Sequence, residues 1–94
     1  MLALSATDEA RAALRAVRDR NPGLFAQISE QLSSWRQEPH PEQVGRAFRL
    51  SDDRTARLKL FYDHVERTDL ALVWTVEDVA GVGTLTVVAL EAVG

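Results

Sequence analysis

The residues in this sequence with the clearest capacity for chemistry are the cations of a short central segment. Residues 46–59 carry five cations and two carboxylates, whereas the whole chain of 94 residues has a formal net charge of −3. The five cations are Arg46, Arg49, Arg54, Arg57 and Lys59. Because the planar fork of arginine matches phosphate and carboxylate groups, this segment predicts a site for an anionic partner. A base composition of the gene that favours arginine codons explains the same residues without a binding site.

Alternation along a strand indicates which of these cations can act together, since successive side chains of a strand point to opposite faces of the sheet. If Ala56, Leu58, Leu60 and Tyr62 face a helical layer, the opposite face presents Thr55, Arg57, Lys59 and Phe61, with Arg46 or Arg49 on a neighbouring strand. Cations and an aromatic ring on an uncovered face suit RNA, because they bind phosphates, stack on a base and stabilise the charge that develops on cleavage. A solvated polar face is the alternative.

Two side chains near this segment can transfer protons. Tyr62 belongs to the same strand, and His64 lies beside Asp63 and Glu66, where an imidazole can act as a general acid or base. A histidine in a turn is more often simply solvated. The candidate catalytic residues are therefore Arg57, Lys59, Tyr62 and His64, and the candidate RNA-binding residues are Arg46, Arg49, Arg57 and Lys59.

The sequence argues against several other kinds of site. It contains no cysteine, which excludes disulfides, thiolate ligands and a thiol nucleophile. His40 and His64 lack the i, i+4 spacing of a helical metal-binding pair. The segment 81–83, Gly-Val-Gly, lacks the lysine and the following helix of a phosphate loop, so it predicts a hairpin turn. We therefore expect neither a metal nor another cofactor.

Composition predicts one globular domain over residues 1–94. The chain is 46% hydrophobic and 27% charged, as is typical of a folded domain. Its acidic net charge lacks the overall basic character of a nucleic-acid-binding domain. No apolar run approaches the roughly 20 residues that cross a bilayer, so we expect no membrane contact and a cytoplasmic location.

The N-terminal part predicts two helices that form a hairpin over residues 1–37. Ser5 to Asp8 resemble a helix cap, and apolar residues then recur at helical spacing, which predicts a helix near residues 6–20. The break at Asn21-Pro22-Gly23 predicts the start of a second helix. That helix extends to about residue 36, and Trp35 on its apolar stripe is expected in the core.

The pattern changes after Pro39 and Pro41 to the alternation and short apolar runs of strands. Short polar or glycine-containing connections between these runs predict an antiparallel meander over residues 43–92. Residues 70–76 are apolar on both faces and are expected in the middle of the sheet, with a short strand at residues 1–4 beside them. The predicted fold class is α+β, an N-terminal helix hairpin packed on an antiparallel meander of three to five strands.

This order of elements resembles the RelE/ParE toxin superfamily over nearly the whole chain. The local similarities are the helix hairpin from Ala6 to Trp35 and Gly45-Arg46 leading into the strand 55–60, where such toxins often have an arginine within an apolar alternation. Residues 72–76 and 85–90 are similar to the central and final strands of the family. The resemblance implies a toxin that is neutralised by a cognate antitoxin.

The resemblance also implies possible targets. RelE-type members cleave mRNA on the ribosome, and ParE-type members act on DNA gyrase. Arg57, and after it Arg46 and Lys59, match positions where the family has basic residues. The chain departs from the family because residues 72–76 contain no arginine and the final strand ends without a basic or histidine-bearing tail. The expected function is an RNA-binding or RNA-cleaving toxin that inhibits translation.

Another class of function fits the same sequence. A non-catalytic interaction module, either a homodimer or a protein that binds a partner peptide at an exposed sheet edge or between helices and sheet, agrees with the acidic total and with the missing catalytic tail. A gyrase-binding protein without nuclease chemistry is the remaining alternative.

Overall fold

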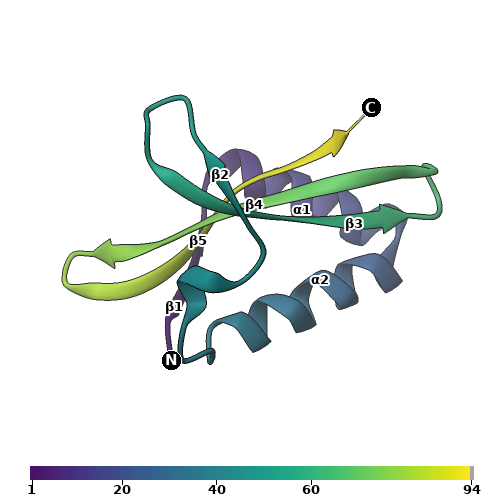
Figure 1. Cartoon of the computed structure of the whole chain (residues 1–94). Coiled ribbons are helices and arrows are strands. Elements are labelled where there is room, and N and C mark those ends of the chain that lie inside the picture. Colours follow the sequence, from purple (N-terminus) through teal and green to yellow (C-terminus); the bar gives the residue numbers. More distant parts are fainter. Residues whose placement is uncertain (94) are drawn as a thin grey trace.

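The computed structural model describes residues 1–93 and places two helices against one face of a five-stranded sheet (Figure 1). The elements, in chain order, are β1 (Ala3–Ala6), α1 (Asp8–Arg20), α2 (Pro22–Trp35), the 3₁₀ turn η1 (Pro41–Gln43), β2 (Arg46–Arg49), β3 (Thr55–Asp63), β4 (Thr68–Val79) and β5 (Val82–Val93). The α+β class with N-terminal helices is thereby confirmed. Within these residues no helix is long and apolar enough to span a membrane.

Local capping explains where the helices begin. The Thr7 side chain accepts a hydrogen bond from the Ala10 N–H at 3.1 Å and caps α1. Our predicted cap at Ser5 is wrong, because that residue belongs to β1. The Asn21 side chain accepts from the Leu24 N–H at 3.2 Å, and Pro22 occupies the first turn of α2, as the sequence predicts. A missing amide proton costs nothing in the first turn of a helix.

The strand order is β1-β5-β4-β3-β2, so β4 is central, in agreement with its two-sided apolar pattern. β1 runs parallel to β5, with Ala3 opposite Thr84 and Ala6 opposite Val87. The sheet is therefore mixed. The antiparallel meander predicted over residues 43–92 is confirmed as β2 to β5, whereas our prediction of a first strand beside residues 70–76 is wrong, because β1 pairs with β5. The period of a strand shows which side chains share a face and carries no information about a pairing partner some 80 residues away.

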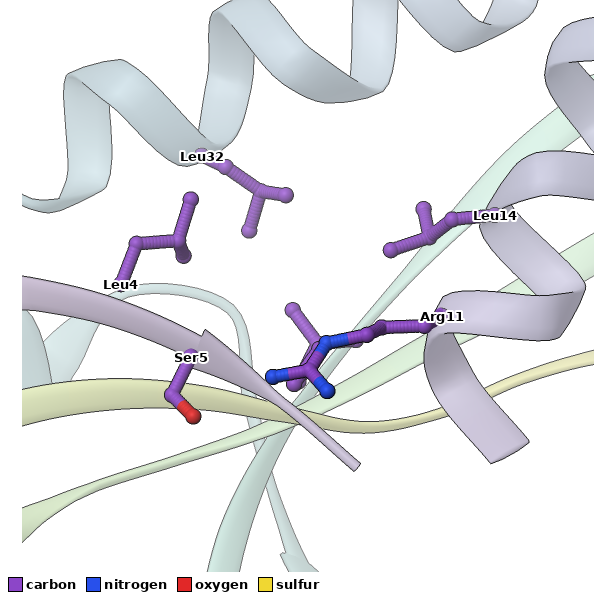
Figure 2. Close-up of a pocket in the computed structure, with 7 residues that line it drawn as sticks. Leu4, Ser5, Arg11, Leu14 and Leu32 are labelled. Atoms are coloured by element: carbon purple, nitrogen blue, oxygen red, sulfur yellow. The ribbon is translucent and has the colours of Figure 1, made fainter. Parts of the chain in front are cut away.

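The edge strand β1 is fixed by backbone and side-chain contacts. Leu2 N–H donates to the Arg36 carbonyl at 2.9 Å, and Arg36 Nε donates back to the Leu2 carbonyl at 2.8 Å. Leu4 points from β1 toward Leu32 of α2 (Figure 2). The N-terminal strand is therefore attached both to β5 and to the end of α2.

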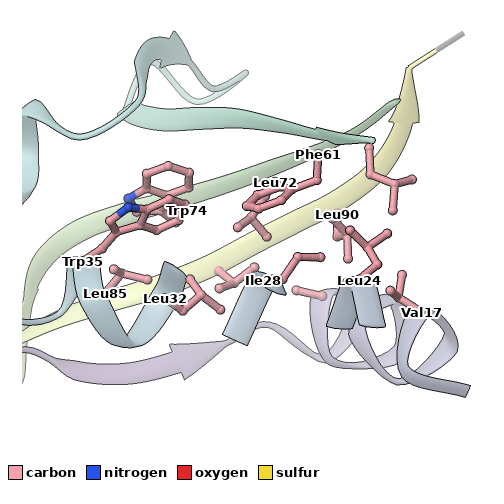
Figure 3. Close-up of a cluster of buried hydrophobic side chains, with 13 residues drawn as sticks. Val17, Leu24, Ile28, Leu32, Trp35, Phe61, Leu72, Trp74, Leu85 and Leu90 are labelled. Carbon is pink, nitrogen blue, oxygen red and sulfur yellow. The ribbon is translucent and has the colours of Figure 1, made fainter. Parts of the chain in front are cut away.

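The main core lies between the helices and one sheet face (Figure 3). At one end Trp35 of α2 stacks on Trp74 of β4, with ring centroids 4.3 Å apart and planes 16° from parallel. The remaining buried members include Val17, Leu24, Ile28, Leu32, Phe61, Leu70, Leu72, Leu85, Val87 and Leu90. Trp35 is thus a core residue, as predicted, and truncating a buried tryptophan of this kind costs about 3–5 kcal/mol.

A buried ion pair attaches the helix hairpin to the turn between β3 and β4. The fully buried Asp63 carboxylate accepts from Arg20 Nη2 at 2.6 Å and from Asn21 Nδ2 at 3.1 Å. It also accepts from the backbone N–H groups of Val65 and Glu66. One carboxylate therefore joins the α1–α2 connection to the end of β3.

Candidate functional site: a basic groove at the sheet edge

The faces of β3 are the reverse of our prediction. Phe61 is buried in the core beneath the helices, and Lys59 Nζ donates to Gln31 Oε1 of α2 at 3.2 Å. Leu60 and Tyr62, which were expected to face the helices, are 41% and 48% exposed. The register explains the reversal, because Lys59 lies opposite Leu72 and Phe61 opposite Leu70, and directly paired residues share a face. Arg57 and Lys59 therefore lie on the helix side.

Arg57 supports the chain that forms the groove wall. Its Nε donates to the Val44 carbonyl and its Nη2 to the Gly45 carbonyl, both at 2.7 Å. Gly45 has a φ of 74°, and a Cβ there would lie 2.8 Å from the Leu58 carbonyl oxygen and 2.9 Å from the Trp74 ring. Only glycine fits this close approach without strain, so Arg57 and Gly45 together hold the connection before β2 against the sheet.

Lys59 lies over an aromatic surface and keeps its ammonium group near solvent. Its Nζ is 5.9 Å from the centroid of Trp35 and 5.7 Å from that of Phe61. Cations at this distance from an aromatic face are held by the ring quadrupole, and a long lysine stem can cover apolar surface while its charge stays hydrated. The ammonium group is therefore positioned at the mouth of the groove.

These residues enclose a groove of about 380 Å³ between α2, the segment before β2, and β3. Its lining residues are Trp35, Val44, Gly45, Arg46, Leu58, Lys59 and Leu60. Arg46 and Lys59 thus meet at one site with Arg57 behind its wall. Within residues 1–93 none of these three cations forms an ion pair. The groove therefore presents uncompensated positive charge in an acidic protein.

The groove adjoins an unpaired stretch of strand. β2 pairs with β3 only from Thr55 to Leu58, whereas β3 continues to Asp63 with β4 on its other side. Over residues 59–63 no described strand occupies the outer edge. Such an edge presents free backbone N–H and C=O groups to a further strand.

The remaining predicted residues lie outside the groove. Arg49 extends from β2 to Asp53, with Nη1 3.4 Å from Oδ1. Tyr62 and His64 contact each other edge to face, with centroids 4.7 Å apart, and neither lines the groove. The structure thus brings together Arg46, Arg57 and Lys59 and leaves the two candidate proton-transfer groups apart from them.

Two carboxylates near β3 are held in their charged form. Burial raises the pKa of Asp63, but hydrogen bonds from Asn21, Arg20 and two backbone N–H groups outweigh it and lower that pKa to about 2. The Arg54 backbone N–H, 3.2 Å from Asp52 Oδ1, holds the pKa of Asp52 below its ordinary value. Arg54 also contacts Glu77 at 3.1 Å, so this cation of the basic segment is already neutralised.

Sequence reasoning missed Trp35, Val44 and Gly45 as parts of a site. Trp35 belongs to α2, and the other two precede β2, so only the fold brings them beside Lys59. Gly45 before a basic strand was a usable signal, since an isolated glycine next to a strand often marks a close backbone approach.

The described chain contains no group of three histidine, aspartate or glutamate side chains that could hold a metal ion. No family model, curated protein or solved structure matches this chain.

Proposed function

We propose that this protein is the partner-binding component of a toxin–antitoxin-type pair and that it binds an extended, acidic segment of its partner protein along the free edge of β3. The proposal is supported above all by residues 59–63 of β3, whose outer edge pairs with no described strand and lies beside a groove lined by Arg46 and Lys59. Addition of a strand to a sheet edge supplies affinity through backbone hydrogen bonds and specificity through alternate side chains.

The two faces of β3 specify what such a segment should contain. On the helix side Lys59 favours a carboxylate, because opposite charges across an interface attract. On the other face Leu60 and Tyr62 offer exposed apolar surface. A strand with acidic and apolar side chains in alternation matches both faces.

The test is a binding titration with a synthetic peptide of alternating glutamate and valine. We expect Lys59→Glu to weaken binding by about tenfold or more, because it replaces an attraction with a repulsion. The matched control is Arg49→Glu, which makes the same charge change in the same segment but outside the groove. Equal weakening by both variants would mean that net charge, and not the groove, governs binding.

The same groove supports a second candidate function, that of a toxin that binds mRNA and inhibits translation. Arg46, Arg57 and Lys59 gather at one place without a carboxylate partner in the part of the chain that the structure describes, and such cations favour phosphate. Because Tyr62 and His64 lie apart from them, this candidate is an RNA-binding inhibitor more readily than a nuclease.

Induced expression in a bacterial host, with growth and bulk translation followed, tests this candidate. We expect arrest by the wild-type chain and relief by Lys59→Ala, whereas Arg49→Ala should still arrest growth. Lys59 is preferable to Arg57, because Arg57→Ala also releases the Val44 and Gly45 carbonyls. Normal growth with folded protein would remove this candidate, and inhibition of purified DNA gyrase would replace it with the gyrase-directed alternative.

A further inference from the structure

The face of the sheet away from the helices is apolar and uncovered. Both helices lie on one side of the sheet (Figure 1), and no helix among residues 1–93 lies against the other side. A sheet with one face in water ordinarily has polar side chains on that face. Here six large apolar side chains on it are between 41% and 54% exposed, namely Phe48, Leu60, Tyr62, Val79, Val82 and Val93. We call this surface the open face.

The middle of the open face combines a row of large side chains with a row of smaller ones. Ala71 and Val73 of β4 point to this face and are nevertheless buried. Their pairing partners on β3 are Leu60 and Leu58, and directly paired residues share a face. Two packed sheets interdigitate their facing side chains. The open face therefore fits a second copy of itself in which the larger row of each copy lies over the smaller row of the other.

A twofold axis parallel to the strands, between β3 and β4, produces this arrangement. It places β3 of each copy over β4 of the other, with Leu60 over Ala71 and Leu58 over Val73. In the sheet β2 lies next to β3, and β5 lies next to β4. The same axis therefore places β2 of each copy over β5 of the other. Twofold interfaces have this reciprocity, since both copies use the same patch.

The charges beside the apolar rows agree with this axis. Arg46 of β2 pairs with Leu58, and Glu91 of β5 pairs with Ala71, so both charged side chains are on the open face. Within residues 1–93 neither of them forms an ion pair. Two strands separate them, which is about 14 Å across the sheet, so they do not meet within one chain. The axis brings Arg46 of one copy to β5 of the other, within about 7 Å along the strand of Glu91, an offset that the long arginine side chain spans.

We propose that a second copy of this chain covers the open face, so that the protein forms a twofold dimer of two packed sheets. Leu58 and Leu60 supply the apolar contact at its centre. Arg46 of each copy pairs with Glu91 of the other at its two sides. The dimer thereby removes from water the apolar surface that the helices leave uncovered.

The remaining charged side chains of the open face are compatible with this packing. Arg54 and Glu77 already neutralise each other at 3.1 Å. Asp69 pairs with Tyr62 within the sheet, and the axis places it over Tyr62 of the other copy. A tyrosine hydroxyl group donates a hydrogen bond to a carboxylate, so this contact also has matching partners.

The open face is large enough for a stable dimer. Its five strands, about 4.8 Å apart and about nine residues long, span roughly 24 by 30 Å, or about 700 Å². Specific interfaces bury about 800 Å² on each partner. The face of one sheet therefore supplies nearly the area that a specific interface uses.

The dimer and the peptide site proposed above use different groups. Lys59 points to the helix side of the sheet, and the free backbone groups of residues 59–63 lie at the sheet edge. Lys59→Glu should therefore weaken peptide binding and leave dimerisation unchanged. Leu60 and Tyr62 adjoin both surfaces, so neither is a test position. The two proposals can thus fail independently.

Sedimentation equilibrium across a range of protein concentrations tests the dimer. We expect the wild-type chain to dimerise and Ala71→Glu to weaken dimerisation by about tenfold or more, because it places a charge at the centre of the contact. The matched control is Ala92→Glu, which makes the same change at an exposed position paired with Leu70 on the helix side and should leave dimerisation unchanged. Circular dichroism verifies that each variant is folded.

Charge exchange tests the twofold axis itself. Arg46→Glu and Glu91→Arg should each weaken dimerisation, because like charges then meet at both sides of the contact. An equimolar mixture of these two variants should associate more strongly than either alone, since both contacts of the mixed dimer again join opposite charges. Arg49→Glu, on the helix side opposite Thr55, is the control and should dimerise as the wild type does.

Three results would overturn the proposal. The first is a wild-type chain that stays monomeric up to its solubility limit. The second is a dimer that Ala71→Glu and Ala92→Glu affect equally, or whose charge-exchanged variants associate no better when mixed. The third is growth into open chains, which indicates a contact that does not close.

Discussion

Single residues determine whether the groove exists, and Gly45 is the most constrained of them. Its φ of 74° and its approach to Leu58 and Trp74 leave no room for a side chain. We expect Gly45→Ala to lower the free energy of unfolding by about 2–4 kcal/mol, because it combines backbone strain with steric overlap. Urea unfolding followed by tryptophan fluorescence measures this loss, since the Trp35–Trp74 stack lies directly behind the site.

Gly23 provides the control for that substitution. It lies within α2, and the nearest atom to an added Cβ is Asn21 Oδ1 at 3.8 Å. Alanine at this position should stabilise the protein by about 0.5–1 kcal/mol, since glycine is a poor helix residue. If Gly45→Ala and Gly23→Ala changed the free energy of unfolding by the same amount, the loss at Gly45 would not come from its backbone conformation.

Asp63 gives the protein a defined response to acid. Its pKa is about 2 in the folded chain against an ordinary 3.8, so the folded state binds this proton less readily than the unfolded state. The resulting stabilisation is fully present above pH 3.8 and is lost as the pH falls toward about 2. We expect Asp63→Asn to lower the melting temperature near neutral pH, with the difference from the wild type shrinking toward pH 2. A difference that is constant across this range would assign the effect to packing alone.

The burial of Asp63 also shows what sequence reasoning cannot see at the scale of residues. An aspartate followed by a histidine in a polar stretch predicts a solvated turn, and charged residues are rarely buried without a partner. Its partners Arg20 and Asn21 lie more than 40 positions away. Only the packing of the helix hairpin on the sheet makes this carboxylate a structural group.

Among the elements, the β4–β5 hairpin has the most demanding turn. Ala80 and Gly81 have φ values of 52° and 81°, the combination that a two-residue turn of type I′ requires. Glycine accepts this conformation readily, but alanine does so at a cost of about 1 kcal/mol.

Ala80→Asn should therefore stabilise the protein by about 0.5–1 kcal/mol, because asparagine followed by glycine is the preferred pair for this turn. Urea unfolding measures the change, with all variants at one protein concentration because association also stabilises the folded state. Ala80→Val should have the opposite sign, since a β-branched residue tolerates positive φ poorly. Equal stability of the asparagine and valine variants would contradict the assigned turn.

The elements themselves follow from the sequence to different degrees. The helix hairpin and the central position of β4 were predictable, because capping residues and two-sided apolar runs are local signals. The face of β3 was not, because Leu58, Leu60 and Phe61 put apolar side chains on both of its faces. Its orientation is decided by β4, whose Leu70, Leu72 and Trp74 line the core opposite Phe61, Lys59 and Arg57.

The same contrast holds for the candidate site. The sequence identified Arg46, Arg57 and Lys59, and in the fold Arg46 and Lys59 line one groove while Arg57 supports its wall. It also associated Arg49, Tyr62 and His64 with them, although these side chains point elsewhere. Sequence spacing shows which residue types lie close to one another along the chain. Which of them share a surface depends on where β2 begins and ends and on the path of the chain just before β2.

For the whole molecule, the important feature is that its two open edges differ in character. The β3 edge has uncompensated cations beside exposed Leu60 and Tyr62, and the β1 edge has an apolar pocket lined by Leu4, Leu14 and Leu32. The helices and the Trp35–Trp74 stack lie between them as one packed layer. The two edges therefore present different surfaces, and in the part of the chain that the structure describes only the β3 edge combines uncompensated cations with an unpaired stretch of strand.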